Sequence, residues 1–243
     1  MELGALQYGY VALAAMIVGF TKTSVGGVGI LAVLLMALAI PGKASPGVLL
    51  PLLIAADVMA VIWYRRACRW DILLKLMPVT ALGVLGGAVL LRAAPDTDFE
   101  RLIGWTILAM LALDLSLNQG LRRHMQGRAM TTVAGVLAGA ASMVANAAGP
   151  IFGIYLLQAK LAKNAFVGTR SWFFLAMNTV KLPFAIGLGL VTPATLALDA
   201  AMLPMILGGA FLGRALLGWI NIALFAALIR IAALTAAMRL IFG

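Results

Sequence analysis

Eight apolar stretches separated by short loops constrain this chain more than any other feature of its sequence. They cover residues 5–40, 46–64, 71–91, 101–118, 129–159, 166–190, 195–213 and 220–241. The hydrocarbon core of a bilayer, about 30 Å thick, is crossed by a helix of roughly 20 apolar residues. Hydrophobic residues make up 64% of the chain and charged residues 11%, against about half and a quarter in soluble domains. The sequence therefore predicts an all-α, polytopic transmembrane helical bundle.

Two of these stretches are too long for one membrane-crossing helix. Residues 5–40 would form a helix about 54 Å long at 1.5 Å per residue, and residues 129–159 present the same difficulty. Each contains helix breakers near its middle, Gly26-Gly27-Val28-Gly29 in the first and Asn146-Ala147-Ala148-Gly149-Pro150 in the second. We therefore expect each stretch to be a broken or re-entrant helical hairpin, with two arms joined by an irregular tip.

Sparse sequence matches at a nearly constant offset indicate that the chain is duplicated. The offset is 120 to 122 residues for Leu85-Gly86-Gly87-Ala88 with Leu207-Gly208-Gly209-Ala210, Gly19 with Gly139, Gly29 with Gly149, Gly47 with Gly168, and Asp57 with Asn178. These matches predict a first transmembrane repeat at 1–118, a basic linker loop at 119–128 and a second repeat at 129–243.

The basic residues predict the orientation of the two repeats. Short cytoplasmic loops of membrane proteins are enriched in lysine and arginine, which places Arg65, Arg66, Arg69 and the linker at 119–128 inside. If each broken segment enters and leaves by the same face, the two repeats have opposite topology. Both termini are then outside. The expected location is a multi-pass position in the cell membrane.

Charges inside the apolar stretches indicate where a function resides, because each costs at least about 2.5 kcal/mol at mid-span. Lys22 lies at the first tip, beside Thr23, Ser24 and Gly27. The second arm of each hairpin would begin with unpaired N–H groups and the positive end of a helix dipole. Two such helix ends facing one cavity form an anion site, whereas simple kinks packed against small residues are the alternative.

The second repeat adds further cations and amides to this predicted site. Arg170 and Lys181 are eleven residues apart, close to three helical turns, so they share a helix face with Asn178. The second tip contributes Ser142, Asn146 and Gly149. We predict that these groups bind a small oxyanion, while snorkelling or structural ion pairing is the alternative for each cation.

Asp57 is the acid nearest the centre of an apolar stretch. It is a candidate for proton coupling, because a buried carboxylate can titrate far from its solution pKa. A static ion pair with Lys22 or Lys181 is the alternative interpretation.

Several other kinds of function find no support in the sequence. One cysteine and one histidine, Cys68 and His124, are too few for a disulfide, a Cys/His zinc site or a haem site. No Ser/His/Asp set, HExxH motif or phosphate-binding loop is present. Most basic residues lie in short loops rather than in a stripe for nucleic acid. We therefore expect no enzyme activity, cofactor, metal or nucleic-acid partner, but contact with lipid.

Three segments resemble the TauE/SafE sulfite exporter family, also called the four-toluene sulfonate uptake permease family. They are Gly19-Phe20-Thr21-Lys22-Thr23, Ser142-Met143-Val144-Ala145-Asn146-Ala147-Ala148-Gly149-Pro150, and Ala165-Phe166-Val167-Gly168-Thr169-Arg170-Ser171-Trp172-Phe173-Phe174 with Asn178-Thr179-Val180-Lys181-Leu182-Pro183-Phe184. The resemblance covers nearly the whole chain. It implies an inner-membrane secondary transporter that exports or imports sulfite or an organosulfonate.

The repeat alignment predicts one asymmetric anion site, because its basic residues are not duplicated. Lys22 aligns with Ser142, and Arg170 aligns with Leu49. A passive anion channel and a non-transport membrane scaffold are the rival functions. The sequence leaves open the substrate, the direction of transport and the formation of oligomers.

Overall fold

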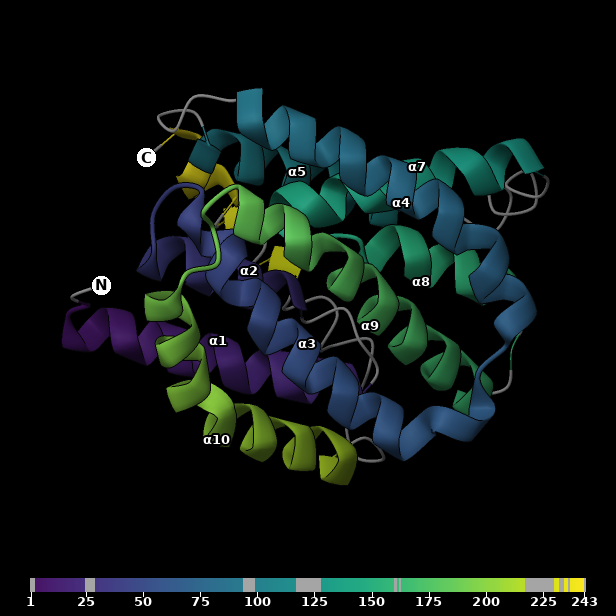
Figure 1. The fold of residues 1–243 in the computed structure, drawn as a ribbon, viewed down its shortest axis with the longest axis horizontal. Helices are drawn as coiled ribbons and strands as arrows, with labels where there is room; N and C mark the ends of the chain where they lie inside the picture. Colours follow the sequence, from purple (N-terminus) through teal and green to yellow (C-terminus); the bar gives the residue numbers. More distant parts are fainter. Residues whose placement is uncertain are drawn as a thin grey trace.

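The structure, a computed structural model, describes residues 3–24, 29–93, 99–116, 128–159, 161, 163–216, 230–231, 234–235 and 237–242. The first half contains α1 (Ala5–Thr23), α2 (Gly29–Ala39), α3 (Ala44–Tyr64), the 3-10 turn η1 (Arg65–Ala67), α4 (Trp70–Ala93) and α5 (Phe99–Ser116). The second half contains α7 (Arg128–Ala145), α8 (Gly149–Gln158), α9 (Lys163–Gly187) and α10 (Pro193–Leu216) (Figure 1). No strand occurs in these ranges, and the predicted all-α class is confirmed.

Among the described residues, three helical segments are long and apolar enough to cross a membrane, namely Ala44–Ala67, Trp70–Ala93 and Pro193–Leu216. Large apolar side chains on the outside of the bundle are exposed, including Val89 at 70% and Phe211 at 61%. Such surfaces are stable in lipid but not in water. The chain is therefore a membrane protein.

Both over-long stretches are interrupted at the breakers. α1 ends at Thr23 and α2 begins at Gly29, while α7 ends at Ala145 and α8 begins at Gly149. Asn146, the residue directly after α7, has a φ of 52°. This is a left-handed conformation that asparagine tolerates better than most residues. α2 packs against α1, and α8 packs against α7. Gly26, Gly27 and most of the linker at 119–128 lie outside the described residues.

The helices of one half pack on helices of the other half. α3 and α9 run side by side through the middle of the bundle, with the α1–α10 pair on one flank and the α4–α7 pair on the other (Figure 1). Glycines allow these helices to touch at the backbone. A Cβ atom at Gly209 would overlap the carbonyl oxygen of Met16, and one at Gly83 would overlap that of Val136.

The α1–α10 pair and the α4–α7 pair each have a second glycine contact, four residues further along both helices. Gly213 meets the carbonyl oxygen of Phe20, and Gly87 approaches that of Ala140. Gly83 and Gly87 on α4 thus make the contacts that Gly209 and Gly213 make on α10, which is an offset of 126 residues. The Leu-Gly-Gly-Ala match in the sequence has an offset of 122 residues. The difference is about one helical turn, which leaves the glycines on the same face. Sequence similarity alone could not separate the two registers.

α3 and α9 run in opposite directions where they pack. Gly47, near the start of α3, meets the carbonyl oxygen of Leu190, just beyond α9. Gly168, near the start of α9, meets the carbonyl oxygen of Tyr64 at the end of α3.

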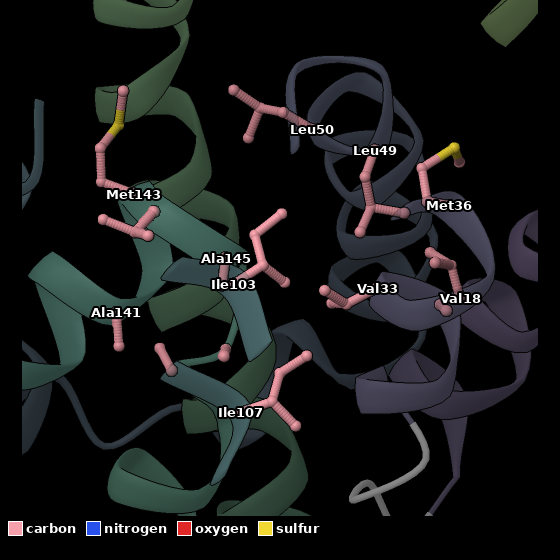
Figure 2. Close-up of a cluster of buried hydrophobic side chains, with 14 of the residues drawn as sticks. Val18, Val33, Met36, Leu49, Leu50, Ile103, Ile107, Ala141, Met143 and Ala145 are labelled. Atoms are coloured by element: carbon pink, nitrogen blue, oxygen red, sulfur yellow. The ribbon is translucent and has the colours of Figure 1, made fainter. Parts of the chain in front are cut away.

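A buried apolar core lies beside the ends of α1 and α7. Its labelled members are Val18, Val33, Met36, Leu49, Leu50, Ile103, Ile107, Ala141, Met143 and Ala145 (Figure 2). They come from α1, α2, α3, α5 and α7, which belong to both halves. Because this core is close-packed, it holds the two helix ends in fixed relative positions.

Candidate functional site

Two predicted site residues are joined by a buried carboxylate. The Lys22 Nζ atom at the end of α1 lies 2.7 Å from Oδ1 of Asp57 on α3, and their side chains are 10% and 0% exposed. The Asn178 amide on α9 donates a 2.8 Å hydrogen bond to the other carboxylate oxygen, Oδ2. Asp57 and Asn178, equivalent positions in the predicted repeats, are therefore in direct contact across the interface of the two halves.

Lys181 is held by neutral oxygens alone. Its Nζ atom donates to Oγ of Ser142 at 3.0 Å, to Oδ1 of Asn178 at 3.3 Å and to Oδ1 of Asn146. A lysine ammonium has three donors, and all three are used here. The positive charge of Lys181 is thus hydrogen-bonded, and no carboxylate of the described residues is in direct contact with it.

Asn146 ties the second helix break to the first half. Its side-chain oxygen accepts from Lys181, and its Nδ2 atom donates to the carbonyl oxygen of Pro46 on α3 at 3.1 Å. Both ends of the amide are occupied, so its orientation is fixed by this network. Gly149 begins α8 three residues later, without a side chain to add to the site.

Arg170 closes the C-terminal end of α1. Its Nη2 atom donates to the carbonyl oxygens of Thr21 at 2.9 Å, Ser24 at 3.0 Å and Lys22 at 3.4 Å. The last carbonyls of a helix lack partners within the helix, and a cation is stabilised at this negative end of the dipole. Arg170 is 7% exposed, so its side chain is buried in the bundle against the end of α1 and does not extend to the outer surface.

An aromatic cluster supports Lys22 from α9 and α8. The Lys22 ammonium lies 4.2 Å from the centroid of the Phe174 ring, a cation–π geometry. Phe174 packs edge-on against Phe173 and Phe152, which are stacked on each other with centroids 3.7 Å apart. The sequence analysis did not assign these aromatic residues to the site, although Phe173 and Phe174 belong to the motif at 165–174.

The hydroxyl groups at the end of α1 differ in their partners. Thr23 Oγ1 lies 2.9 Å from the carbonyl oxygen of Ala210 on α10 and 3.1 Å from that of Gly19, so its proton links α1 to the bundle. The hydroxyls of Ser24 and Thr21 are buried and have no hydrogen-bond partner. Thr21 was not among the predicted site residues, although it belongs to the motif Gly19–Thr23.

The cluster carries more positive than negative charge. Lys22, Arg170 and Lys181 contribute three cations, and Asp57 is the one carboxylate that contacts them within the described ranges. Asp199 is also buried, on α10, but neither of its carboxylate oxygens has a hydrogen-bond partner. No group of three His, Cys, Asp or Glu residues suited to a metal occurs in the part of the chain that the structure describes.

The fold and the cluster define a helical membrane protein with a net-positive polar site buried between two halves. Residues 11–240 match the family model described as Sulfite exporter TauE/SafE. The chain belongs to this family of membrane anion transporters, as its motifs indicated. No curated protein and no solved structure matches the chain significantly.

Proposed function

We propose that the chain is a secondary transporter that carries a small sulfur oxyanion, sulfite or an organosulfonate, through the site between its two broken segments. One observation carries the proposal: within the described residues, the three buried cations of the cluster are accompanied by one carboxylate in contact with it, Asp57. Uncompensated charge is expensive in a membrane interior. An anion that enters the site offsets this cost, whereas a cation would increase it. In this proposal Asp57 is a static partner of Lys22, because both of its oxygens are engaged, and proton coupling is the alternative.

The packing supports two repeats of inverted topology. α3 and α9 carry the equivalent residues Asp57 and Asn178 and run antiparallel, as inversion requires. The flanking pairs run parallel, since Met16 and Phe20 meet Gly209 and Gly213 in ascending order. Parallel α1 and α10 agree with the orientation from loop charges, in which both run inward. Transporters of this architecture bind substrate near the midplane, between helices interrupted at that depth.

The orientation can be tested with Cys68, the single cysteine of the chain, which lies between η1 and α4. We expect a membrane-impermeant maleimide to label it in inside-out vesicles but not in intact cells. Burial raises the pKa of the Cys68 thiol above its usual value. The reactive thiolate is therefore scarce at neutral pH, and labelling should accelerate as the pH rises into the alkaline range. Cys68→Ser provides the unlabelled control, and labelling in intact cells would contradict the orientation.

The transport proposal is tested by flux into proteoliposomes. The purified protein should move sulfite or a short sulfonate with saturable kinetics, as expected of a carrier. Lys181→Ala and Asn146→Ala should each reduce this flux at least about tenfold, because they remove a buried charge or its orienting amide. Thr179→Ala is a matched control, since Thr179 is an exposed residue of α9 whose hydroxyl donates to Leu175 of its own helix.

Other outcomes would support the rival functions. Flux that follows the voltage without saturating would indicate an anion channel. Absence of flux for every oxyanion would indicate a non-transport scaffold. Full flux in both Lys181→Ala and Asn146→Ala would show that the anion passes elsewhere.

A further inference from the structure

The two helix breaks offer an incoming anion different numbers of unused donors. At the second break, all three Lys181 donors are occupied, and both ends of the Asn146 amide are bonded. Ser142, which is 1% exposed, accepts one of the Lys181 bonds. At this break the Ser142 hydroxyl proton and one N–H of Asn146 are therefore the donors of these three side chains without a described acceptor, and a ligand that needs more donors must displace existing hydrogen bonds.

At the first break, donors are available. Ser24 is 2% exposed, and its hydroxyl has no partner, nor does the buried hydroxyl of Thr21. The Lys22 ammonium has three donors, and its contacts are one oxygen of Asp57 and the face of Phe174. Leaving a buried polar group unsatisfied is costly, so such groups in a native protein call for an explanation.

We infer that the transported anion is held at the first helix break by the hydroxyls of Ser24 and Thr21 together with Lys22, and that the second break is a structural support. This inference rests on the proposed function and assigns the contacts of the same site. Arg170 bonds the carbonyl oxygens of Thr21, Lys22 and Ser24. The full positive charge of Arg170 on the last α1 carbonyls offsets the partial negative charge of that helix end. The backbone that carries the Ser24 and Thr21 hydroxyls is therefore held in place before an anion binds. Lys181 acts on the anion through its charge, while its N–H groups keep their bonds to Ser142, Asn146 and Asn178.

The two serines provide a matched test, because both are buried at the end of a broken segment and differ in their partners. Sulfite binding to the purified full-length protein is measured by titration calorimetry, and stability by thermal unfolding without sulfite. Ser24→Ala should weaken sulfite binding roughly tenfold, the value of one lost hydrogen bond to an anion. It should leave the melting temperature unchanged, because no bond within the protein is lost.

Ser142→Ala should show the opposite pattern. It removes an acceptor from a buried ammonium, and the melting temperature should fall by about 4 °C or more. The dissociation constant for sulfite should stay within roughly threefold of the wild-type value. Thr21→Val should behave like Ser24→Ala. Thr23→Val should behave like Ser142→Ala, since it removes the hydroxyl that bonds Ala210.

Each result decides the inference. Weakened binding in Ser142→Ala with unchanged binding in Ser24→Ala and Thr21→Val would overturn it, and so would equal losses at both breaks. In either case, the wild-type protein would still bind sulfite, and the proposed function would stand. If the wild-type protein binds neither sulfite nor methanesulfonate, the proposed function fails and the inference fails with it.

Discussion

Replacing Asp57 by alanine should lower the free energy of unfolding by about 3–5 kcal/mol, the usual cost of removing one partner of a buried ion pair. The carboxylate is fully buried, and its two oxygens serve Lys22 and Asn178. Without it, the Lys22 ammonium keeps only the Phe174 ring among the contacts described for it. Because folded proteins are stable by only about 5–15 kcal/mol, the variant should unfold at a much lower temperature in detergent.

A double variant separates the energy of the ion pair from the effect of replacing either side chain by itself. Lys22→Met with Asp57→Leu removes both charges and leaves no unpaired charge, although Asn178 loses its acceptor. The destabilisation of this double variant should therefore be well below the sum of those of Lys22→Met and Asp57→Leu alone. Thermal unfolding of the wild type, both singles and the double gives the coupling energy directly. Additive effects, or an Asp57→Ala variant as stable as the wild type, would contradict the buried pair.

Replacing Gly209 by alanine should separate α1 from α10 and destabilise the bundle by about 1–3 kcal/mol or more. The added methyl would overlap the carbonyl oxygen of Met16, and a backbone atom cannot rotate away as a side chain does. Gly208→Ala is the matched control, because nothing lies within 4 Å of its added Cβ atom. That change should be neutral or slightly stabilising, since alanine favours a helix by about 1 kcal/mol over glycine.

The other half of the chain offers the same contrast. Gly83→Ala should be as damaging as Gly209→Ala, because its methyl would overlap the carbonyl oxygen of Val136. Gly86→Ala, with open space around it, should match Gly208→Ala. All four variants can be compared by thermal unfolding and by the fraction of folded protein recovered from membranes. Equal behaviour of Gly208→Ala and Gly209→Ala would contradict the observed packing of α1 on α10.

Much of the site could be predicted because buried charge in an apolar sequence is rare. Lys22, Asp57, Arg170 and Lys181 stand out against their neighbours without any knowledge of contacts, and the structure brings all four into one region. Their roles could not be predicted. Arg170 bonds to carbonyl oxygens of α1, and two of the three Lys181 partners are more than 30 residues away in the sequence, so no local pattern could reveal these contacts.

The repeat stays a prediction, and the sequence leaves its register ambiguous. Glycines recur at nearly constant offsets because close helix contacts require them in both halves. However, a shift of one helical turn preserves the glycine-bearing face. The helix contacts favour an offset of 126 residues, because Gly83 meets Val136 in the way that Gly209 meets Met16.

The sequence by itself determined that this chain lies in a membrane as helices, that two of its apolar stretches are interrupted, and that cations lie inside the apolar region. These properties follow from local hydropathy, helix breakers and the cost of buried charge. Only the tertiary structure decided which donors are already used. Ser142 and Ser24 look alike in sequence. However, Ser142 accepts a hydrogen bond from Lys181, 39 residues away, whereas the Ser24 hydroxyl has no hydrogen-bond partner. Hydrogen-bond saturation depends on distances between helices, which no local pattern encodes.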